Sequence, residues 1–417
     1  MNLDSRLSGG VDMWGTSVPR YLIAFFGALV ALGPLSMDAY LPAIPAMAED
    51  FGVSVVRVNH TLSVYLIGNA FGQLFGGAFS DQIGRKRICY IGLTVYIATT
   101  LALALVNTVE QALVLRFFQA IGGGFSTVIC MASVRDIYPV DELGRRFATM
   151  MMIVLVAPLV APVLGAQLLP LGWQSIFLLK AAYALGLLVL YAFIVPETHK
   201  GRWGALSVTS IYAQCANVVV RRVDGRFLPI RYAFAMGLSI SVLMVFVTNA
   251  SFVYLEYFDI SPSRFPIFFG LSVVGFMATN LFSMRRLTSN NAGRYFRAGL
   301  RIQIVAVLLM LAATAAGLAS LWVFVPLMVV TMSTLGLVGP SGSARYMSFF
   351  RELAGSASSV HTTLSFGLGG VLGAVTSELN DGTLLPMVAV MAGASIIANL
   401  VTWSVPPSPV EGTEPLS

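Results

Sequence analysis

The sequence predicts an all-α polytopic membrane protein with twelve transmembrane helices in two six-helix bundles. Three observations predict this fold class. Hydrophobic residues make up 57% of the 417 residues and charged residues only 11%, whereas an ordinary soluble domain carries about 25% charged residues. Apolar runs of about 20 residues, long enough to cross a bilayer, recur along the whole chain. The basic residues fall almost entirely into alternate loops between these runs.

The composition also excludes several classes of protein. So few charges cannot cover the water-facing surface of a soluble enzyme, a nucleic-acid-binding protein or a disordered scaffold. Three cysteines are too few, and odd in number, for a disulfide framework. The sequence has no Walker loop, no metal-spaced His/Cys cluster and no nucleophile elbow. We therefore expect no enzymatic activity, no metal site, no bound cofactor and no nucleic-acid partner.

The predicted helices are the apolar runs between charged residues, Pro or Gly. The first six cover about 19–44, 57–79, 88–106, 111–134, 147–169 and 174–195. The next six cover about 230–255, 265–284, 300–319, 321–342, 356–377 and 384–405. One long polar stretch separates the two sets. The predicted organisation is a tail at 1–18, a first bundle at 19–196, a linker at 197–228, a second bundle at 229–405 and a tail at 406–417.

The basic residues predict the orientation of these helices, because Lys and Arg accumulate in cytoplasmic loops. Of the 25 Lys and Arg residues, only Arg57 and Arg264 fall on the opposite side, and only Arg116 and Lys180 fall inside spans. Residues 1–18 carry charges and no signal-peptide cleavage pattern, so we expect the first helix to stay as an anchor. Both termini and the linker are therefore predicted to be cytoplasmic.

The turn after the second predicted helix carries a distinctive pattern. Gly77 permits close approach between helices, and Gly84 permits a tight reversal of the chain. Asp81 is favoured at a neighbouring helix N-terminus, and the basic triplet that follows holds the loop in the cytoplasm. This loop resembles the signature loop of the major facilitator superfamily, G-x-x-x-D-[RQ]-x-G-R-[KR]-[KR], over Gly77–Arg87. The resemblance implies the major facilitator fold.

Four further stretches are similar to the drug:proton antiporter branch of that superfamily, and most closely to its bicyclomycin/chloramphenicol-resistance type. The motif D-x-Y-L-P-x-x-P is matched at Met37–Pro45, and R-x-x-Q-x-x-G is matched at Leu115–Gly122. The motif V-R-D-x-Y is matched at Val134–Tyr138, and the antiporter motif at Ala157–Gly165. The usual G-P-x-x-G-G of the antiporter motif is A-P-x-x-G-A here, ending at Ala166.

The resemblance implies a proton-coupled antiporter that exports small amphipathic compounds, including antibiotics, from the cytoplasm. It implies a bacterial inner-membrane protein that acts as a monomer, uses the proton gradient in place of a cofactor, and works by alternating access. It also implies a cytoplasmic gate, in which Arg85 pairs with Asp136, formed by Gly77, Asp81, Gly84, Arg85 and Asp136. A helix-bend motif would contain Pro158, Pro162 and Gly165.

Two other functions stay open on the sequence alone. The chain could export a native metabolite, such as a sugar, an amino acid or a siderophore-like compound, with drug efflux incidental. It could also be a non-transporting membrane sensor on the same scaffold, although the tail after Ser404 is short and Pro-rich. The two prolines could equally serve only to bend their helix.

Ionisable residues inside the membrane are functional candidates, because each costs a few kcal/mol to insert. At about 1.5 Å of rise per residue, Asp38, Arg116 and Lys180 reach similar depth in the outer half of the first bundle. We interpret Asp38 as the protonatable carboxylate and Arg116 as its counter-charge, which favours the charged form of the acid. Asp38 could instead be a helix-end turn residue, and Lys180 could snorkel or pair structurally.

Polar side chains elsewhere in the spans are candidates for lining a transport cavity. His361 could relay protons, or could be a buried neutral histidine that is hydrogen-bonded to a neighbour. Glu256 lies at the outer end of the seventh span, where it could line a vestibule. The full candidate set is Tyr40, Tyr65, Asn69, Gln73, Gln119, Lys180, Tyr232, Asn249, Glu256 and His361.

Overall fold

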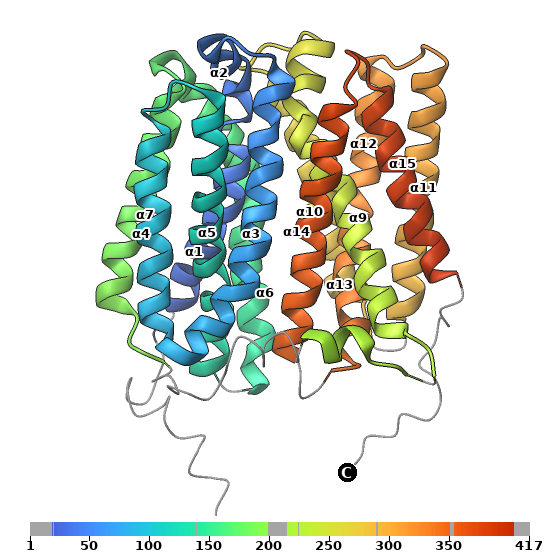
Figure 1. The fold of residues 1–417 in the computed structure, drawn as a ribbon. Helices are drawn as coiled ribbons and strands as arrows, with labels where there is room; N and C mark the ends of the chain where they lie inside the picture. The colour runs from blue at the N-terminus through green and yellow to red at the C-terminus, as the bar shows by residue number, and fades with distance from the viewer. Residues whose placement is uncertain are drawn as a thin grey trace, which may run out of the picture. The chain divides into compact units, whose positions relative to one another are not determined.

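The structure, a computed structural model, describes residues 19, 21–138, 140–198, 215–223, 225–288, 291–350 and 354–403. The predicted tails at 1–18 and 406–417 and most of the predicted linker therefore lie outside the described residues. The described chain is almost entirely helical (Figure 1), and its only β pairing is an isolated bridge between Val223 and Arg226. The all-α prediction is confirmed.

Ten segments of the described chain are long and apolar enough to cross a membrane. Two further helices, α3 (Val55–Ile83) and α14 (Ala354–Glu378), have 29 and 25 residues and so exceed the length that a span requires. Both are rich in small or polar residues, which lowers their hydropathy. Together with the ten, they fit the predicted count of twelve.

Large apolar side chains cover much of the helix surface, as a lipid environment requires. Leu400 is 66% exposed, Trp322 80% and Phe193 85%. In a water-soluble protein such side chains would favour aggregation, whereas helices that cross a bilayer present them to hydrocarbon. The chain is therefore a multi-pass membrane protein.

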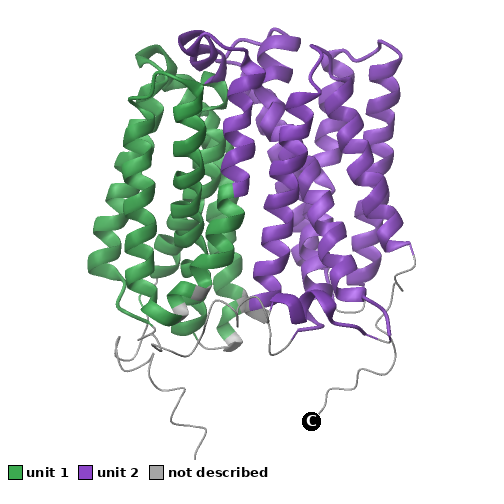
Figure 2. Ribbon diagram, viewed as in Figure 1, with its two compact units in different colours: residues 1–43, 68–209 green, residues 44–67, 210–417 purple. Residues whose placement is uncertain are grey.

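The described helices belong to two compact units (Figure 2), one made of residues 1–43 and 68–209 and the other of residues 44–67 and 210–417. This division differs from the two predicted bundles in one place, because residues 44–67 group with the second half of the chain. Helix α3 explains the difference. A Cβ at Gly370 would lie 2.9 Å from the carbonyl oxygen of Ser63, so the first part of α3 packs tightly in the second unit.

The first unit contains the helices that position the charged candidates. Their bounds are α1 (Tyr21–Asp38), η2 (Leu41–Ala43), α4 (Arg85–Leu103), α5 (Val109–Ile137), α6 (Val140–Leu168), η3 (Leu169–Leu171) and α7 (Gln174–Ile194), with residues 68–83 of α3. Helix α1 packs against α6, and α4 packs against α5 and α7.

Glycine sets the closeness of the α4–α5 contact. A Cβ at Gly122 would lie 2.5 Å from the carbonyl oxygen of Gly92, so neither position has room for a larger residue. A polar cap precedes helix α5: the side chain of Thr108 accepts a hydrogen bond from the backbone N–H of Gln111 at 3.3 Å. The side chain of Gln111 in turn accepts from the N–H of Asn107 at 3.1 Å. This reciprocal pair fixes the start of the helix that carries Arg116.

The first predicted span, at about 19–44, is one helix only as far as Asp38, and its last residues form a separate turn. Helix α1 ends at Asp38, a single 3-10 turn covers Leu41–Ala43, and the short helix α2 (Ile44–Phe51) follows. Pro42 accounts for the break, because it lacks an N–H and restricts the residue before it. The break leaves the last carbonyl groups of α1 without partners in their own helix.

The second unit contains the remaining helices. Their bounds are α2, residues 55–67 of α3, α9 (Leu228–Ser251), the π-helical turn η4 (Phe252–Tyr257), α10 (Phe265–Arg286), α11 (Ala292–Ala315), α12 (Leu321–Ser333), α13 (Leu335–Met347), α14 and α15 (Leu385–Thr402). Helix α9 is the centre of this unit and packs against α14 and α15. The predicted span at 321–342 is divided at Thr334 between α12 and α13.

Candidate functional site

Asp38 lies at the last residue of α1 and is only 5% exposed. Within the part of the chain that the structure describes, its carboxylate forms no hydrogen bond and no ion pair. A carboxyl group buried in this way is costly to charge, because no partner replaces the water that it has lost. Asp38 is therefore a buried acid whose charge state depends on its access to water.

Arg116 binds the end of the same helix. Its side chain is 1% exposed, and its Nη1 and Nη2 both donate to the carbonyl oxygen of Ser36 at 3.2 Å. Nη1 also donates to Oε1 of Gln119 at 2.6 Å, and Nε2 of Gln119 donates to the hydroxyl of Thr100 at 2.6 Å. A guanidinium at a helix C-terminus satisfies an orphan carbonyl and is favoured by the helix dipole. Arg116 thus caps α1.

The predicted pair between Asp38 and Arg116 is not formed among the described residues. Arg116 contacts Ser36 and the ring of Tyr40, which are four residues apart and share one face of the chain at the end of α1. Asp38 lies between them in sequence, and residues two apart do not face the same way on a helix. Similar depth in the membrane was therefore insufficient to predict contact, because the direction of each side chain also decides it.

Lys180 does come close to Arg116. The Cζ atom of Arg116 lies 4.2 Å from the ring centroid of Tyr40, and Nζ of Lys180 lies 5.1 Å from the same centroid. Nζ of Lys180 also lies 3.9 Å from the ring centroid of Phe177. Both basic side chains lie against the one ring of Tyr40, so positive charges on the two of them would repel each other. We call the residues that meet here the α1 cluster: Ser36, Tyr40, Arg116, Phe177 and Lys180.

Helix α6 packs directly on the backbone at the end of α1. A Cβ at Gly165 would lie 1.7 Å from the carbonyl oxygen of Ala39, so only glycine fits at this position. Pro158 and Pro162 lie inside α6, which continues as one helix from Val140 to Leu168. The sequence therefore singled out Gly165 correctly as a site of close contact, and a bend at the two prolines stays a prediction.

The second group of charges lies where α3 ends and α4 begins. Gly84 makes this reversal with φ 109°, a left-handed backbone conformation that suits glycine, as predicted. Nε of Arg85 lies 3.1 Å from Oδ2 of Asp136, and Nη1 of Arg85 donates to the hydroxyl of Ser80 at 2.5 Å. The ion pair implied by the family resemblance is thus present. The side chain of Asp81 lies outside the described residues.

Glu197 completes this group, and the sequence motifs did not single it out. Its carboxylate accepts hydrogen bonds from the backbone N–H of Arg85 at 2.9 Å and of Lys86 at 3.1 Å. These are the first N–H groups of α4, where a negative charge is favoured. The available signal was an acidic residue directly after the sixth span. We call Ser80, Arg85, Asp136 and Glu197 the α4 cluster.

Gly77 does not have the predicted role. A Cβ there would meet only the side chain of Val128, at an ordinary 3.8 Å. The close contacts of α3 with α5 fall instead at Gly68, Gly72 and Gly76, where a Cβ would lie 2.5, 2.6 and 2.9 Å from its neighbours. Spacing in sequence identified the motif but not the face of the helix that packs.

The predicted cavity residues divide between the units. Tyr40, Asn69, Gln73, Gln119 and Lys180 are buried in the first unit, and Tyr65, Tyr232 and Asn249 are buried in the second. Glu256 is exposed.

His361 and Asn249 belong to the second unit and have local partners. Nε2 of His361 lies 3.4 Å from the hydroxyl of Ser365, which agrees with the interpretation as a hydrogen-bonded histidine. Nδ2 of Asn249 donates to the carbonyl oxygen of Val245 at 2.8 Å, while its Oδ1 has no partner among the described residues. Neither arrangement assigns a transport role.

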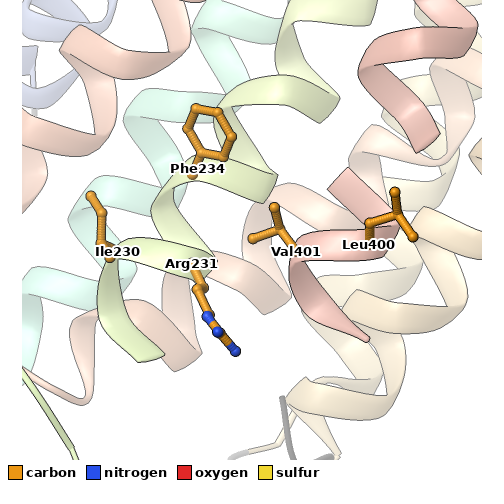
Figure 3. A pocket seen from close by; sticks show the side chains of 5 residues that line it. All are labelled: Ile230, Arg231, Phe234, Leu400 and Val401. Atoms are coloured by element: carbon orange, nitrogen blue, oxygen red, sulfur yellow. The ribbon is translucent and has the colours of Figure 1, made fainter. Parts of the chain in front are cut away.

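One open pocket lies between the start of α9 and the end of α15. Figure 3 shows its lining, in which apolar side chains surround one arginine: Ile230, Arg231, Phe234, Leu400 and Val401. None of the predicted cavity residues lines it. The pocket is therefore not the site that the sequence predicted.

The comparisons with known proteins agree with this architecture. The pattern of the Major Facilitator Superfamily matches residues 24–374. The chain belongs to the major facilitator superfamily. As a major facilitator protein, it is similar in fold to the human organic anion transporter MFSD10, with TM-score 0.69 and 16% identity over 92% of this chain and 100% of that one.

Curated relatives resemble this major facilitator protein along most of its length. It is 29% identical to a bicyclomycin resistance protein homolog of Haemophilus influenzae over 385 residues, which cover 91% of this chain and 94% of the relative. It is also 29% identical to the multidrug resistance protein MdtL of Salmonella schwarzengrund over 294 residues, 68% of this chain and 73% of the relative.

Proposed function

We propose that this major facilitator protein is a proton-coupled antiporter that exports small amphipathic drugs by alternating access. Family membership supports transport rather than enzymatic catalysis. The relatives are a bicyclomycin resistance protein homolog and a multidrug resistance protein, which supports drugs as the class of substrate. The expected partners are therefore a small molecule, protons and the lipid bilayer.

Asp38 is the proposed proton carrier, and its burial is the observation on which this role rests. The carboxyl group is 5% exposed and has no ion-pair partner among the described residues. A buried carboxyl of this kind takes up a proton when it is closed off and releases it when a change of conformation admits water. The capping of α1 by Arg116 leaves that exchange independent of a fixed counter-charge.

The proposed setting is the bacterial inner membrane, with both termini in the cytoplasm and the chain acting as a monomer. The asymmetry of the basic residues supports this orientation. The bacterial origin of the curated relatives supports the location. On this orientation the α4 cluster lies at the cytoplasmic surface, where its ion pair would act as a gate.

Two alternatives make different predictions. An exporter of a native metabolite keeps the same proton cycle and differs only in the compound that it exports. A membrane sensor needs no protonatable group at position 38. Uphill transport that depends on Asp38 therefore separates both transport functions from the sensor.

The test uses the full chain in liposomes with an imposed pH gradient. We expect wild-type protein to move protons when compounds such as bicyclomycin or chloramphenicol are added. Asp38→Asn keeps the size of the side chain but cannot release a proton, so gradient-driven export should fall to background. Asp50→Asn, on the exposed end of α2, is the matched control and should keep wild-type export. Undiminished proton-coupled export by Asp38→Asn would exclude this role for Asp38.

A further inference from the structure

Lys180 is a buried basic residue that the proposed proton cycle does not use. Resting on the proposed efflux function, we propose that Lys180 binds the carboxylate of an amphipathic organic anion, whose apolar body lies against Phe177 and Tyr40. The substrates of this protein would then include monoanionic compounds, and Lys180 would set the preference for them over neutral analogues.

The burial of Lys180 is complete. Its side chain is 0% exposed, and Nζ has no hydrogen-bond partner among the described residues. Lys86 shows the contrast within the same unit, since its Nζ donates to the carbonyl oxygen of Ala192 at 3.0 Å. Buried charged groups in proteins are almost always paired, because an unpaired charge costs several kcal/mol there. Within the described chain, Lys180 thus lacks the hydrogen-bond acceptor or negatively charged partner that a buried lysine normally has.

The described neighbours of Lys180 do not supply that group. Arg116 carries the same charge, and the helix end that it caps accounts for its presence. Asp38, the nearest acid in sequence to this cluster, forms no ion pair within the described part of the chain. Among the residues that the structure describes, two basic side chains therefore meet at Tyr40, and no carboxylate is paired with Lys180.

A structural role does not explain the lysine well. An apolar side chain of similar volume would fill the same space without the cost of burying a charge. The ring faces of Phe177 and Tyr40, at 3.9 and 5.1 Å from Nζ, stabilise a cation only partly. A ligand carboxylate would neutralise Lys180, and the same two rings would contact the apolar part of that ligand.

The side chains of this site are closed off from solvent. Tyr40 and Lys180 are 0% exposed and Arg116 is 1% exposed. The turn at 39–43 lies between α1 and α2, and its backbone oxygen at Ala39 packs on Gly165 of α6. On our proposal, the anion reaches Lys180 when this turn moves during alternating access.

The experiment measures binding to the purified full chain with a matched pair of fluorescent probes. N-dansyl-leucine carries a carboxylate at pH 7, whereas its methyl ester has nearly the same shape and no charge. We expect wild-type protein to bind the acid at least about tenfold more tightly than the ester. Lys180→Met should lose that preference and keep the affinity for the ester, and Lys180→Arg should keep most of the preference.

Three controls make the result decisive. Lys180→Met replaces the buried charge with an apolar side chain of similar length, so it should fold, and size-exclusion chromatography checks this. Arg264→Gln removes an exposed cation on the predicted outer side and should leave the preference unchanged. Chloride titration tests whether an inorganic ion alone occupies the site.

Equal affinity of wild-type protein for acid and ester would overturn the proposal, as would an unchanged preference in Lys180→Met. Occupation of the site by chloride, without any preference for the acid, would also overturn it. Failure here leaves the proposed function intact if gradient-driven drug export still depends on Asp38. Conversely, a Lys180-dependent preference without any gradient-driven export would support the anion site and contradict proton-coupled efflux.

Discussion

The α1 cluster and the α4 cluster belong to the same unit and balance their charges in opposite ways. In the α4 cluster, Arg85 meets a carboxylate at 3.1 Å, and the two side chains are 11% and 26% exposed. In the α1 cluster, Arg116 and Lys180 are buried, and their described contacts are aromatic rings, a backbone carbonyl and the side-chain amide of Gln119 instead of an acid. The comparison shows that, of these two clusters, only the partly exposed charges have partners that a sequence motif can reveal.

The physical reason is the cost of removing a charge from water. A pair of charges at the surface gains little free energy from its attraction and loses little on leaving water, so ordinary acidic and basic side chains can form it. A charged side chain at membrane depth has no bulk water around it, so other groups of the protein must accept its hydrogen bonds. For Arg116 the fold supplies the end of α1. For Lys180, the described contacts are the aromatic rings of Tyr40 and Phe177.

The largest expected effect on stability concerns the packing of α6 against the end of α1, next to the α1 cluster. Gly165→Ala places a methyl group 1.7 Å from the carbonyl oxygen of Ala39, where only backbone movement can relieve the clash. We expect a loss of about 3 kcal/mol in stability, at the upper end of overpacking effects. The matched change beside the α4 cluster is Gly77→Ala, which meets only an ordinary contact at 3.8 Å.

Thermal unfolding of the two purified variants in detergent tests this contrast. Gly77→Ala should be as stable as wild type or slightly more so, because alanine favours the helix. A stable Gly165→Ala protein would mean that α6 does not lie against the end of α1 as the structure places it.

An intermediate effect is expected for the cap on α1. Arg116→Gln removes both hydrogen bonds to the carbonyl oxygen of Ser36 and leaves that oxygen buried. We expect a loss of about 2 kcal/mol, since the cost of an unsatisfied group is partly offset by relief of the repulsion with Lys180. The measurement is again thermal unfolding, and Lys180→Met should stabilise the Arg116→Gln variant less than it stabilises wild type, because the repulsion is already relieved there. Wild-type stability of Arg116→Gln would contradict the capping role.

The smallest expected effect belongs to the exposed pair. Arg85→Gln, Asp136→Asn and the double variant form a thermodynamic cycle whose coupling energy should be about 1 kcal/mol. Because water reaches both side chains, raising the salt concentration should reduce the coupling, whereas the effect of Arg116→Gln should persist. Strictly additive losses at low salt would show that Arg85 and Asp136 do not interact. A charge-exchanged double variant that regains transport would support the proposed gate.

Several features of the molecule could be predicted from the order of its residues. Twelve apolar runs and the one-sided basic residues predicted the membrane class, and residues 77–87 predicted the reversal at Gly84. The resemblance to the superfamily predicted the meeting of Arg85 with Asp136. These predictions succeeded because they depend on composition and on contacts near helix ends. The predicted Asp38–Arg116 pair is not formed among the described residues, because Asp38 lies two residues from Ser36 and from Tyr40, and residues two apart on a helix face different ways.

The sequence by itself determined that this chain crosses a membrane many times, which segments are helical, and which ionisable residues fall within apolar segments. Those properties follow from transfer energies that each residue carries with it. Only the tertiary structure decided that Arg116 caps α1, that Glu197 accepts from the start of α4, and that Lys180 meets two aromatic rings. Such contacts join residues far apart in the chain, so they depend on how the helices are rotated and packed, and a hydropathy pattern carries little information about rotation.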